Sequence, residues 1–254
     1  MKRWWHGLVA FAVALGGLVV APAATAAPPD IVTQLRAVPG LTVVAEHGAP
    51  PGYRLFALTY RQPVDHRQPS RGAFKQRLTL LHKATDQSMV LHTSGYGVYF
   101  DRPFRSEPTF LLGGNQISVE QRFFTPSRPE PPDWTTLTIW QAATDHHRLV
   151  DALKPIYPAK WISTGESKGG MATVYHRRFY PADVAGSVAY VAPNDVVDGV
   201  DVYTQFLDTV GSDPACRKAL ADVQREALRR RTEVVARYSS WAQANNRTFS
   251  RSIG

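Results

Sequence analysis

The chain has 254 residues, of which 44% are hydrophobic and 20% charged, and its net charge is +8. This composition is typical of an ordinary globular protein, and the length suits one domain with room for an insertion. The positive charge comes mainly from arginines spread along the chain. Because no Lys/Arg tract is interleaved with aromatic residues, the sequence argues against a nucleic-acid-binding protein.

The first 27 residues have the pattern of a secretory signal peptide. Lys2 and Arg3 are followed by an apolar and glycine run at 8–20, and residues 24–26 read A-x-A, a cleavage site. A membrane anchor is the alternative, but the apolar run is short for a span, and prolines and small residues follow it. We therefore expect residues 1–27 to be removed, and the mature chain to be secreted and to have no membrane partner.

Two alternating segments, 53–60 and 74–82, predict strands, and the segment between them contains Pro63, Pro69 and Gly72. Proline and glycine at these positions indicate a loop. We therefore expect an antiparallel hairpin at the edge of a sheet.

A short apolar run at 89–93 predicts a buried strand, and it leads into a glycine-rich loop at 94–97. Small residues would let backbone N–H groups in such a loop approach a substrate carbonyl. A plain strand–helix turn is the alternative. His92 lies on the strand, so we interpret it as a core histidine or one behind a site, not as a catalytic base.

The stretch that organises the chain is 165–169, which reads G-x-S-x-G. A β-prone run, 160–164, precedes it, and a helix-compatible run, 171–180, follows it. A strand, a tight turn and a helix are the setting of a nucleophile elbow, in which the central serine, here Ser167, has a strained backbone. The alternative is an incidental serine in a glycine-rich turn.

The elbow suggests specific roles. Ser167 would be the nucleophile, and the backbone N–H of Lys168 would face the site where an oxyanion forms. Gly95 and Tyr96, in the loop after the preceding strand, are the candidates for the second oxyanion donor.

The remaining segments alternate between strand and helix patterns, which implies a mostly parallel sheet with flanking helices. They are a strand at 114–120, a proline-rich loop at 123–129, a helix at 136–153, a strand at 186–192 and helices without strands over 201–245. We expect an α/β fold in which 28–194 form the core and 195–254 begin a helical cap.

Cysteine and histidine are sparse in the chain. Cys216 is the only cysteine, and in a secreted protein we predict that it forms a disulfide with a cysteine beyond residue 254, a free thiol being the alternative. His146 and His147 are adjacent, so we expect them on different sides of a helix as exposed polar residues. No metal or organic cofactor is implied.

Several stretches resemble one family, the bacterial secreted tripeptidyl aminopeptidases. They read QPVDH (62–66), GAFKQR (72–77), VEQRFF (119–124) and TGESKGG (164–170), and the most specific is GESKGGM followed by YHRRFYP. The family is distantly similar to prolyl carboxypeptidase. The resemblance implies an α/β-hydrolase fold, a serine peptidase with Ser167 as nucleophile, and release of short peptides from free N-termini, often after proline.

The resemblance also implies a catalytic Asp and His, in that order, beyond the cap. After Ser167 the only histidine is His176, which would lie more than two helical turns away and beyond hydrogen-bond reach of the serine. Asp195 follows the last predicted strand, but an acid without a base does not activate a serine. We therefore expect a chain that is truncated in the cap and inactive alone.

A peptidase of this kind must hold the ammonium group of its substrate. A carboxylate suits this role because charge-assisted hydrogen bonds are strong. Glu120 is the first candidate, since its strand should end at the same edge of the sheet, and Glu166 is the second. The alternative for both is a structural ion pair with Arg122, Arg128 or Lys168.

Two rival functions remain open at this stage. An elbow does not name the acyl group, so a lipase or esterase on the same fold is possible. The missing base also fits a secreted binding protein that is not catalytic.

Overall fold

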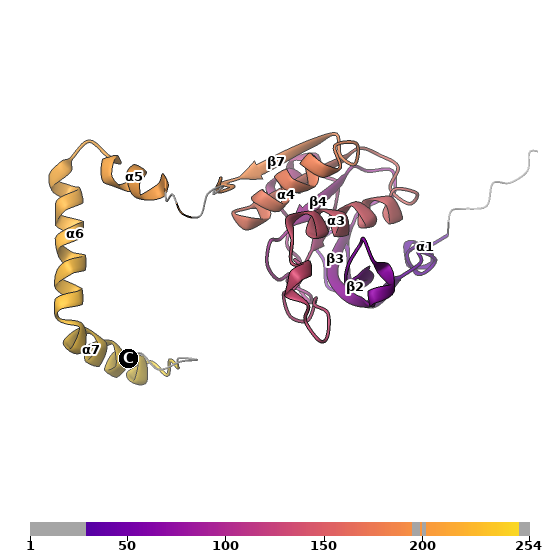
Figure 1. The fold of residues 1–254 in the computed structure, drawn as a ribbon. Helices are drawn as coiled ribbons and strands as arrows, with labels where there is room; N and C mark the ends of the chain where they lie inside the picture. The colour runs from indigo at the N-terminus through magenta and orange to yellow at the C-terminus, as the bar shows by residue number, and fades with distance from the viewer. Residues whose placement is uncertain (1–28, 195–198, 200–201, 249–254) are drawn as a thin grey trace, which may run out of the picture. The chain divides into compact units, whose positions relative to one another are not determined.

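The computed structural model describes residues 29–194, 199 and 202–248 (Figure 1). Residues 1–27 of the expected signal peptide, and Asp195, lie outside the described residues. The chain divides into two compact units, one ending at Ala192 and one beginning at Pro193, and each is described by itself. None of the described helices is both long and apolar enough to cross a membrane.

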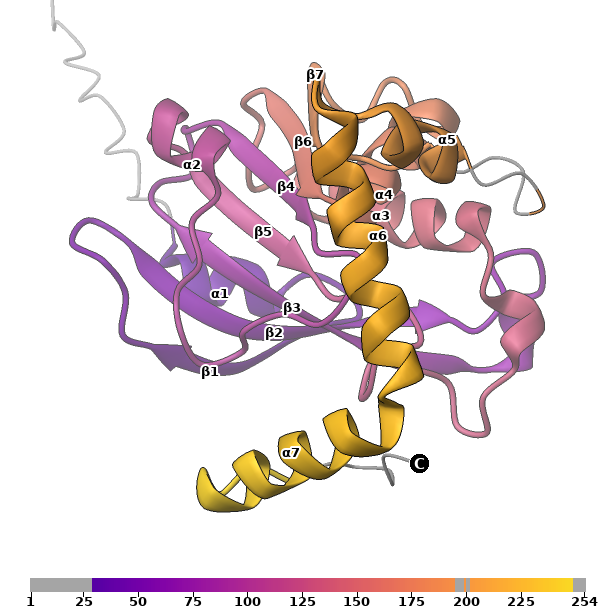
Figure 2. The same ribbon diagram turned by 90° about the vertical axis from the view of Figure 1, so that its left-hand side faces the viewer.

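A seven-stranded sheet forms the first unit, in the order β1-β2-β3-β5-β4-β6-β7. The pairs β1–β2, β2–β3 and β3–β5 are antiparallel. The pairs β5–β4, β4–β6 and β6–β7 are parallel, and Figure 2 shows β5, β4 and β6 side by side. The strands are β1 Leu41–His47, β2 Arg54–Pro63, β3 Ala73–His82, β4 Met89–Thr93, β5 Asn115–Val119, β6 Trp161–Glu166 and β7 Gly186–Tyr190. The predicted parallel core is confirmed.

The predicted hairpin exists, but it is not at the edge of the sheet. β2 and β3 pair along their whole length, from Arg54 opposite His82 to Pro63 opposite Ala73. β1 pairs with the other side of β2 and is itself the edge strand. The prediction was wrong on this point because the position of a strand depends on long-range pairing, which local alternation does not report.

Four helices accompany the sheet: α1 Ile31–Arg36, α2 Glu107–Leu112, α3 Ile139–Leu153 and α4 Lys168–Phe179. Thr138 is the N-cap residue of α3, and its hydroxyl accepts a hydrogen bond from the Gln141 N–H. α3 packs against α4, and α4 packs on β4, β6 and β7. One apolar core joins α1, α3 and the strands, and Leu35, Leu58, Leu91 and Leu149 are fully buried in it.

The second unit contains helices and no strand among its described residues. They are α5 Val202–Thr209, α6 Pro214–Arg229 and α7 Arg231–Ala244, which confirms the predicted helices over 201–245. Ala242 is the one buried residue in the described part of this unit. Cys216 is exposed and its thiol is free, so its disulfide stays a prediction.

The connections of the parallel strands locate the site. After β4 the chain crosses to β5 on one side, and after β6 it crosses to β7 on the other. The crevice between β4 and β6 is therefore the switch point, where open α/β sheets bind ligands beyond the carboxyl ends of the strands. The loop 94–97 and Ser167 follow these two strands.

Candidate active site

Ser167 forms the turn between β6 and α4. Its backbone has φ 54° and ψ −124°, a strained conformation for a residue with a side chain. The turn is held by the Ser167 N–H, which donates to the Tyr190 carbonyl at 3.1 Å, and by the Ser167 carbonyl, which accepts from the Met171 N–H at 3.0 Å. The strand, strained serine and helix predicted from 165–169 are present.

The hydroxyl of Ser167 is not used to hold the helix. A serine at an N-cap usually accepts a hydrogen bond from the first turn, but Ser167 makes no such bond. The residue is exposed, and no described residue hydrogen-bonds to its Oγ. The oxygen therefore faces solvent with its lone pairs free, as a nucleophile requires.

Glycines bring the loop 94–97 against the first turn of α4. A Cβ atom added at Gly95, whose φ is +72°, would lie 2.4 Å from the Gly169 nitrogen. A Cβ atom at Gly169 would lie 2.2 Å from the Thr93 carbonyl oxygen. Only glycine permits this approach, so the sequence itself sets the loop beside the nucleophile.

The approach leaves two backbone donors beside Ser167. The N–H groups of Lys168 and Gly95 have no acceptor among the described residues. Tyr96 differs, because its N–H donates to the Ser94 Oγ at 3.2 Å, and that hydroxyl donates to the Gly97 carbonyl at 2.6 Å. Of the three predicted donors, Lys168 and Gly95 are thus available for an oxyanion. Lys168 also opens α4, where the helix dipole favours negative charge.

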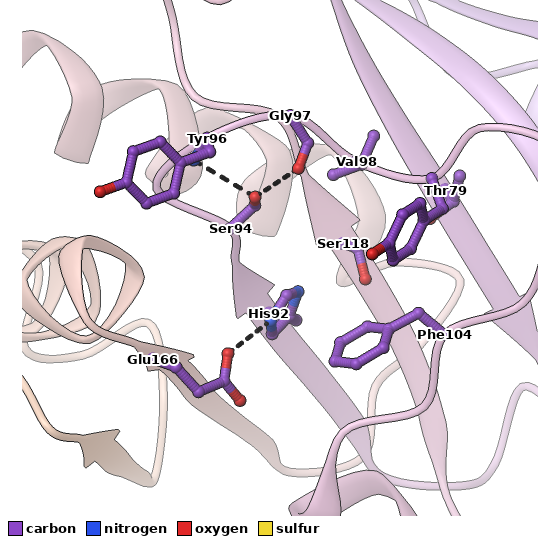
Figure 3. Close-up of a pocket in the computed structure, with 10 residues that line it drawn as sticks. Thr79, His92, Ser94, Tyr96, Gly97, Val98, Phe104, Ser118 and Glu166 are labelled. Atoms are coloured by element: carbon purple, nitrogen blue, oxygen red, sulfur yellow. Dashed lines mark hydrogen bonds and ion pairs between the residues drawn. The ribbon is translucent and has the colours of Figure 1, made fainter. Parts of the chain in front are cut away.

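A cavity of about 460 Å³ lies beside the loop, between the ends of β4, β5 and β6 (Figure 3). Glu166, His92 and Phe104 face it, whereas the ring of Tyr96 turns away from them. The remaining lining residues are Thr79, Ser94, Gly97, Val98, Tyr99 and Ser118. Ser167 itself is not among the lining residues, but Glu166, the residue before it, is.

Glu166 presents a charged carboxylate to this cavity. Its side chain is 48% exposed, and its Oε2 lies 3.2 Å from the His92 Nε2. This hydrogen bond lowers the pKa of Glu166. The His92 ring is buried, and its centroid lies 4.9 Å from that of the Phe104 ring. The Nδ1 of His92 has no hydrogen-bond partner in the described part of the chain. His92 therefore orients Glu166 and does not contact Ser167.

Glu120 does not reach the cavity. It is 2% exposed, its Oε1 accepts from the Ser127 hydroxyl at 2.7 Å, and its Oε2 accepts from the Val98 N–H at 3.2 Å. The carboxylate thus holds the loop that carries Gly97 and Val98. Its burial favours Glu166 over Glu120 as the residue that meets a substrate, which reverses the order expected from the sequence.

Neither glutamate forms the ion pairs weighed from the sequence. Arg122 pairs with Asp145 at 2.7 Å, and Arg128 pairs with Glu130 at 2.7 Å. The Lys168 ammonium lies 5.2 Å from the centres of the Tyr96 and Phe124 rings, a cation–π arrangement. Among the described residues, neither carboxylate pairs with an arginine or a lysine, and the side-chain partner of Glu166 is the His92 ring.

Comparison with known proteins identifies the family of this chain. The family described as PS-10 peptidase S37 matches residues 24–254. The chain belongs to this peptidase family. The match extends over both described units of the S37 chain.

A curated relative of this S37 chain is the prolyl tri/tetrapeptidyl aminopeptidase of Streptomyces mobaraensis, which is 53% identical over 98% of the chain. The chain spans about half of that relative, 53% of its length. Solved structures that match include acetyl xylan esterase 1 from Thermoanaerobacterium, at a TM-score of 0.46, 13% identity, 80% of this chain and 67% of that one. A structure from a study of two prolyl endopeptidases matches at a TM-score of 0.41 and 14% identity, and the match covers 56% of this chain and 22% of that one. Scores this low carry no argument; the α/β-hydrolase fold rests on the sheet, the elbow and the family.

The described histidines of α3 and α4 in this S37 chain have partners other than Ser167. His176 is fully buried in α4, and its Nε2 lies 2.8 Å from the Asp183 Oδ2, so it does not serve Ser167. His146 is buried, and His147 is half-buried against Tyr180. The expectation that both are exposed was wrong, because α3 packs against α4. Asp195 lies outside the described residues.

Two residues that shape the site were not predicted from the sequence. The Thr93 hydroxyl, at the end of β4, lies 2.7 Å from both the Gly169 carbonyl oxygen and the Thr173 hydroxyl. Phe104 forms a wall of the cavity. A polar residue that ends a buried strand was a usable signal for Thr93, whereas nothing local in the sequence marks Phe104.

Proposed function

We propose that this chain provides the nucleophile and the oxyanion donors of a serine peptidase. The observation that carries the proposal is the strained, exposed Ser167 beside two unpaired N–H groups. Ser167 Oγ would attack the scissile carbonyl, and the developing negative charge would be held by the N–H groups of Lys168 and Gly95. A general base would take the Ser167 proton and give it to the leaving amine as the peptide C–N bond breaks, and water would then hydrolyse the acyl-enzyme and restore Ser167.

The general base is supplied by none of the described residues, since none hydrogen-bonds to the Ser167 Oγ. A serine without a base is a weak nucleophile. We therefore expect residues 28–254 by themselves to hydrolyse peptides near the background rate, so activity is measured on the protein as the cell makes it. Ordinary turnover by residues 28–254, lost on Ser167→Ala, would contradict this expectation.

The proposed substrates are peptides with a free N-terminus, from which the enzyme releases three or four residues at a time. The name of the Streptomyces mobaraensis relative supports the length and the preference for proline. The half-exposed Glu166 carboxylate supports the free N-terminus, because an ammonium group in a partly enclosed cavity needs an anionic partner.

Glu166→Gln tests this anchor on two tripeptide amides, one free and one acetylated. Losing a charge-assisted hydrogen bond should lower kcat/KM for the free substrate by about 10–100-fold and leave the acetylated one nearly unchanged. Glu120→Gln should reduce both substrates alike, since Glu120 supports the loop. Glu130→Gln, at an exposed acid paired with Arg128, is the matched control. An equal loss on both substrates for Glu166→Gln would place the anchor elsewhere.

Whether the enzyme cleaves peptides or esters is tested by comparing a fluorogenic tripeptide amide with a nitrophenyl ester. We expect the amide to be cleaved efficiently, and Ser167→Ala to abolish cleavage of both. Efficient hydrolysis of the ester alone would indicate the rival lipase or esterase. No turnover of either, together with tight peptide binding, would indicate a binding protein, a second candidate favoured by the absence of a base at Ser167 among the described residues.

Secretion is part of the proposal and rests on residues 1–27. Expression in a secreting bacterium, followed by N-terminal sequencing of the protein in the medium, should give a start close to Ala27. Retention of an intact Met1 in the membrane fraction would favour the anchor instead.

A further inference from the structure

A cluster of metal-ligating side chains lies where α3 meets the segment between α4 and β7. His147 and Asp151 are one turn apart on α3, and Asp183 follows α4. The His147 ring lies between the two acids, with Nδ1 2.9 Å from the Asp183 Oδ2 and Nε2 3.2 Å from the Asp151 Oδ2. Nothing in the proposed peptidase mechanism uses this cluster.

The donor set suits one kind of ion. Each residue offers one atom, a nitrogen or a carboxylate oxygen, and these atoms all lie within 4.8 Å of one another. Calcium and magnesium prefer oxygen donors alone, whereas imidazole combined with carboxylate suits zinc. Three protein ligands and one water would complete a tetrahedral zinc site.

Neighbouring side chains hold two of the ligands in place. The Tyr180 ring is stacked on the His147 ring, with 4.0 Å between centroids and 6° between planes. The buried His176 binds Asp183 through its Nε2 at 2.8 Å, and its Nδ1 has no partner in the described part of the chain. Metal ligands are usually fixed by such outer contacts, which orient ring and carboxylate before the ion arrives.

Closing the site requires a small movement of one residue. Ligand atoms on a tetrahedral zinc ion lie about 3.3 Å apart, given zinc–ligand distances of about 2.0 Å. The side chain of Asp151 is 62% exposed, so it can turn toward the ion without disturbing the core. Asp183, whose side chain is 7% exposed, would stay in place.

We propose that His147, Asp151 and Asp183 bind one Zn²⁺ ion that ties α3 to the segment after α4. The ion would lie too far from Ser167 to take part in the proposed peptidase reaction, because α4 is 12 residues long and its far end lies about 18 Å from Ser167 at about 1.5 Å per residue. This site goes beyond the proposed peptidase function and does not depend on it. It also departs from the expectation, made from the sequence, that no metal is involved.

The experiment uses untagged protein carrying Cys216→Ser, because an exposed thiol is itself a zinc ligand. After treatment with EDTA and dialysis, ZnCl₂ is titrated by calorimetry and in thermal unfolding. We expect one ion per chain with a micromolar Kd, and a Tm higher by about 5 °C at 100-fold excess over Kd. Co²⁺ in place of Zn²⁺ should give the visible absorption of a four-coordinate ion.

Variants decide whether the ion binds at this place. Asp151→Asn and His147→Gln should each weaken binding at least about 10-fold and remove most of the Tm shift. Asp86→Asn, at an exposed acid outside the cluster, should leave both unchanged. The proposal is overturned if no zinc binds, or if zinc binds equally to all of these variants. Asp183 is left intact because its loss could impair folding.

Discussion

The two ends of α4 are built in opposite ways. At its start, Ser167 has a strained backbone, and the nearby N–H groups of Lys168 and Gly95 have no hydrogen-bond acceptor among the described residues. At its far end, Asp183 accepts from both His147 and His176. The difference shows that polar groups left unsatisfied at the start are available for chemistry, whereas those paired at the far end stabilise the helix. Changes at the two ends should therefore separate activity from stability.

The sharpest test of this contrast is Ser167→Gly. We expect activity to fall by at least about 10⁴-fold, because the nucleophile is removed. Stability should rise by about 1 kcal/mol, because glycine relieves the strain of a positive φ, although its greater freedom when unfolded offsets part of the gain. Chemical denaturation measures the second effect. A less stable variant would contradict the view that the turn stores strain.

Gly95→Ala tests whether the close approach of the loop to α4 creates the oxyanion site. A Cβ atom at 2.4 Å from the Gly169 nitrogen must push the loop away, and losing one oxyanion donor lowers kcat by about 10²–10³-fold. Gly52→Ala is the matched control, because Gly52 also has a positive φ, +79°, but open space around it. Equal effects of the two changes would mean that backbone strain, not contact, is responsible.

Asp183→Asn probes the far end of α4. The change removes the charge and replaces one accepting oxygen with an NH₂ donor beside two histidines, which should destabilise the fold by about 2 kcal/mol. The kcat of the folded protein should stay within about twofold, since the change lies far along α4. Asp151→Asn, at an exposed member of the same cluster, should cost only a few tenths of a kcal/mol in metal-free buffer. A large loss of kcat without loss of stability would break the contrast between the two ends.

The smallest expected effect is on how substrate preference depends on pH, through Glu166 just before α4. The hydrogen bond from His92 lowers the pKa of Glu166, so the carboxylate remains charged below the ordinary glutamate pKa of 4.5. The preference for free over acetylated substrates should therefore persist at pH 4.5 and disappear only as the pH falls further. In His92→Phe the pKa should rise toward its ordinary value, and the preference should weaken at a higher pH. An unchanged profile would show that His92 does not control the charge of Glu166.

The sequence alone determined the elements that local chemistry dictates. G-x-S-x-G between a strand and a helix pattern was enough to locate Ser167, because the strained turn tolerates few other residues. The buried strand at 89–93, its glycine loop and the helices over 201–245 were likewise visible, since burial periodicity and glycine are local signals. These signals also carried the resemblance to a peptidase family, which the match over residues 24–254 bears out.

Tertiary structure alone decided what depends on long-range pairing. β1 covers the predicted edge hairpin, and α3 buries His146 against α4, next to His176. The same packing ranks the candidates at the site: Glu120 is enclosed by Ser127 and Val98, Glu166 faces the cavity, and the Tyr96 N–H is taken by Ser94. Each of these contacts depends on how the folded chain brings particular atoms together. Neither the spacing of residues nor their type determines such contacts before the chain has folded.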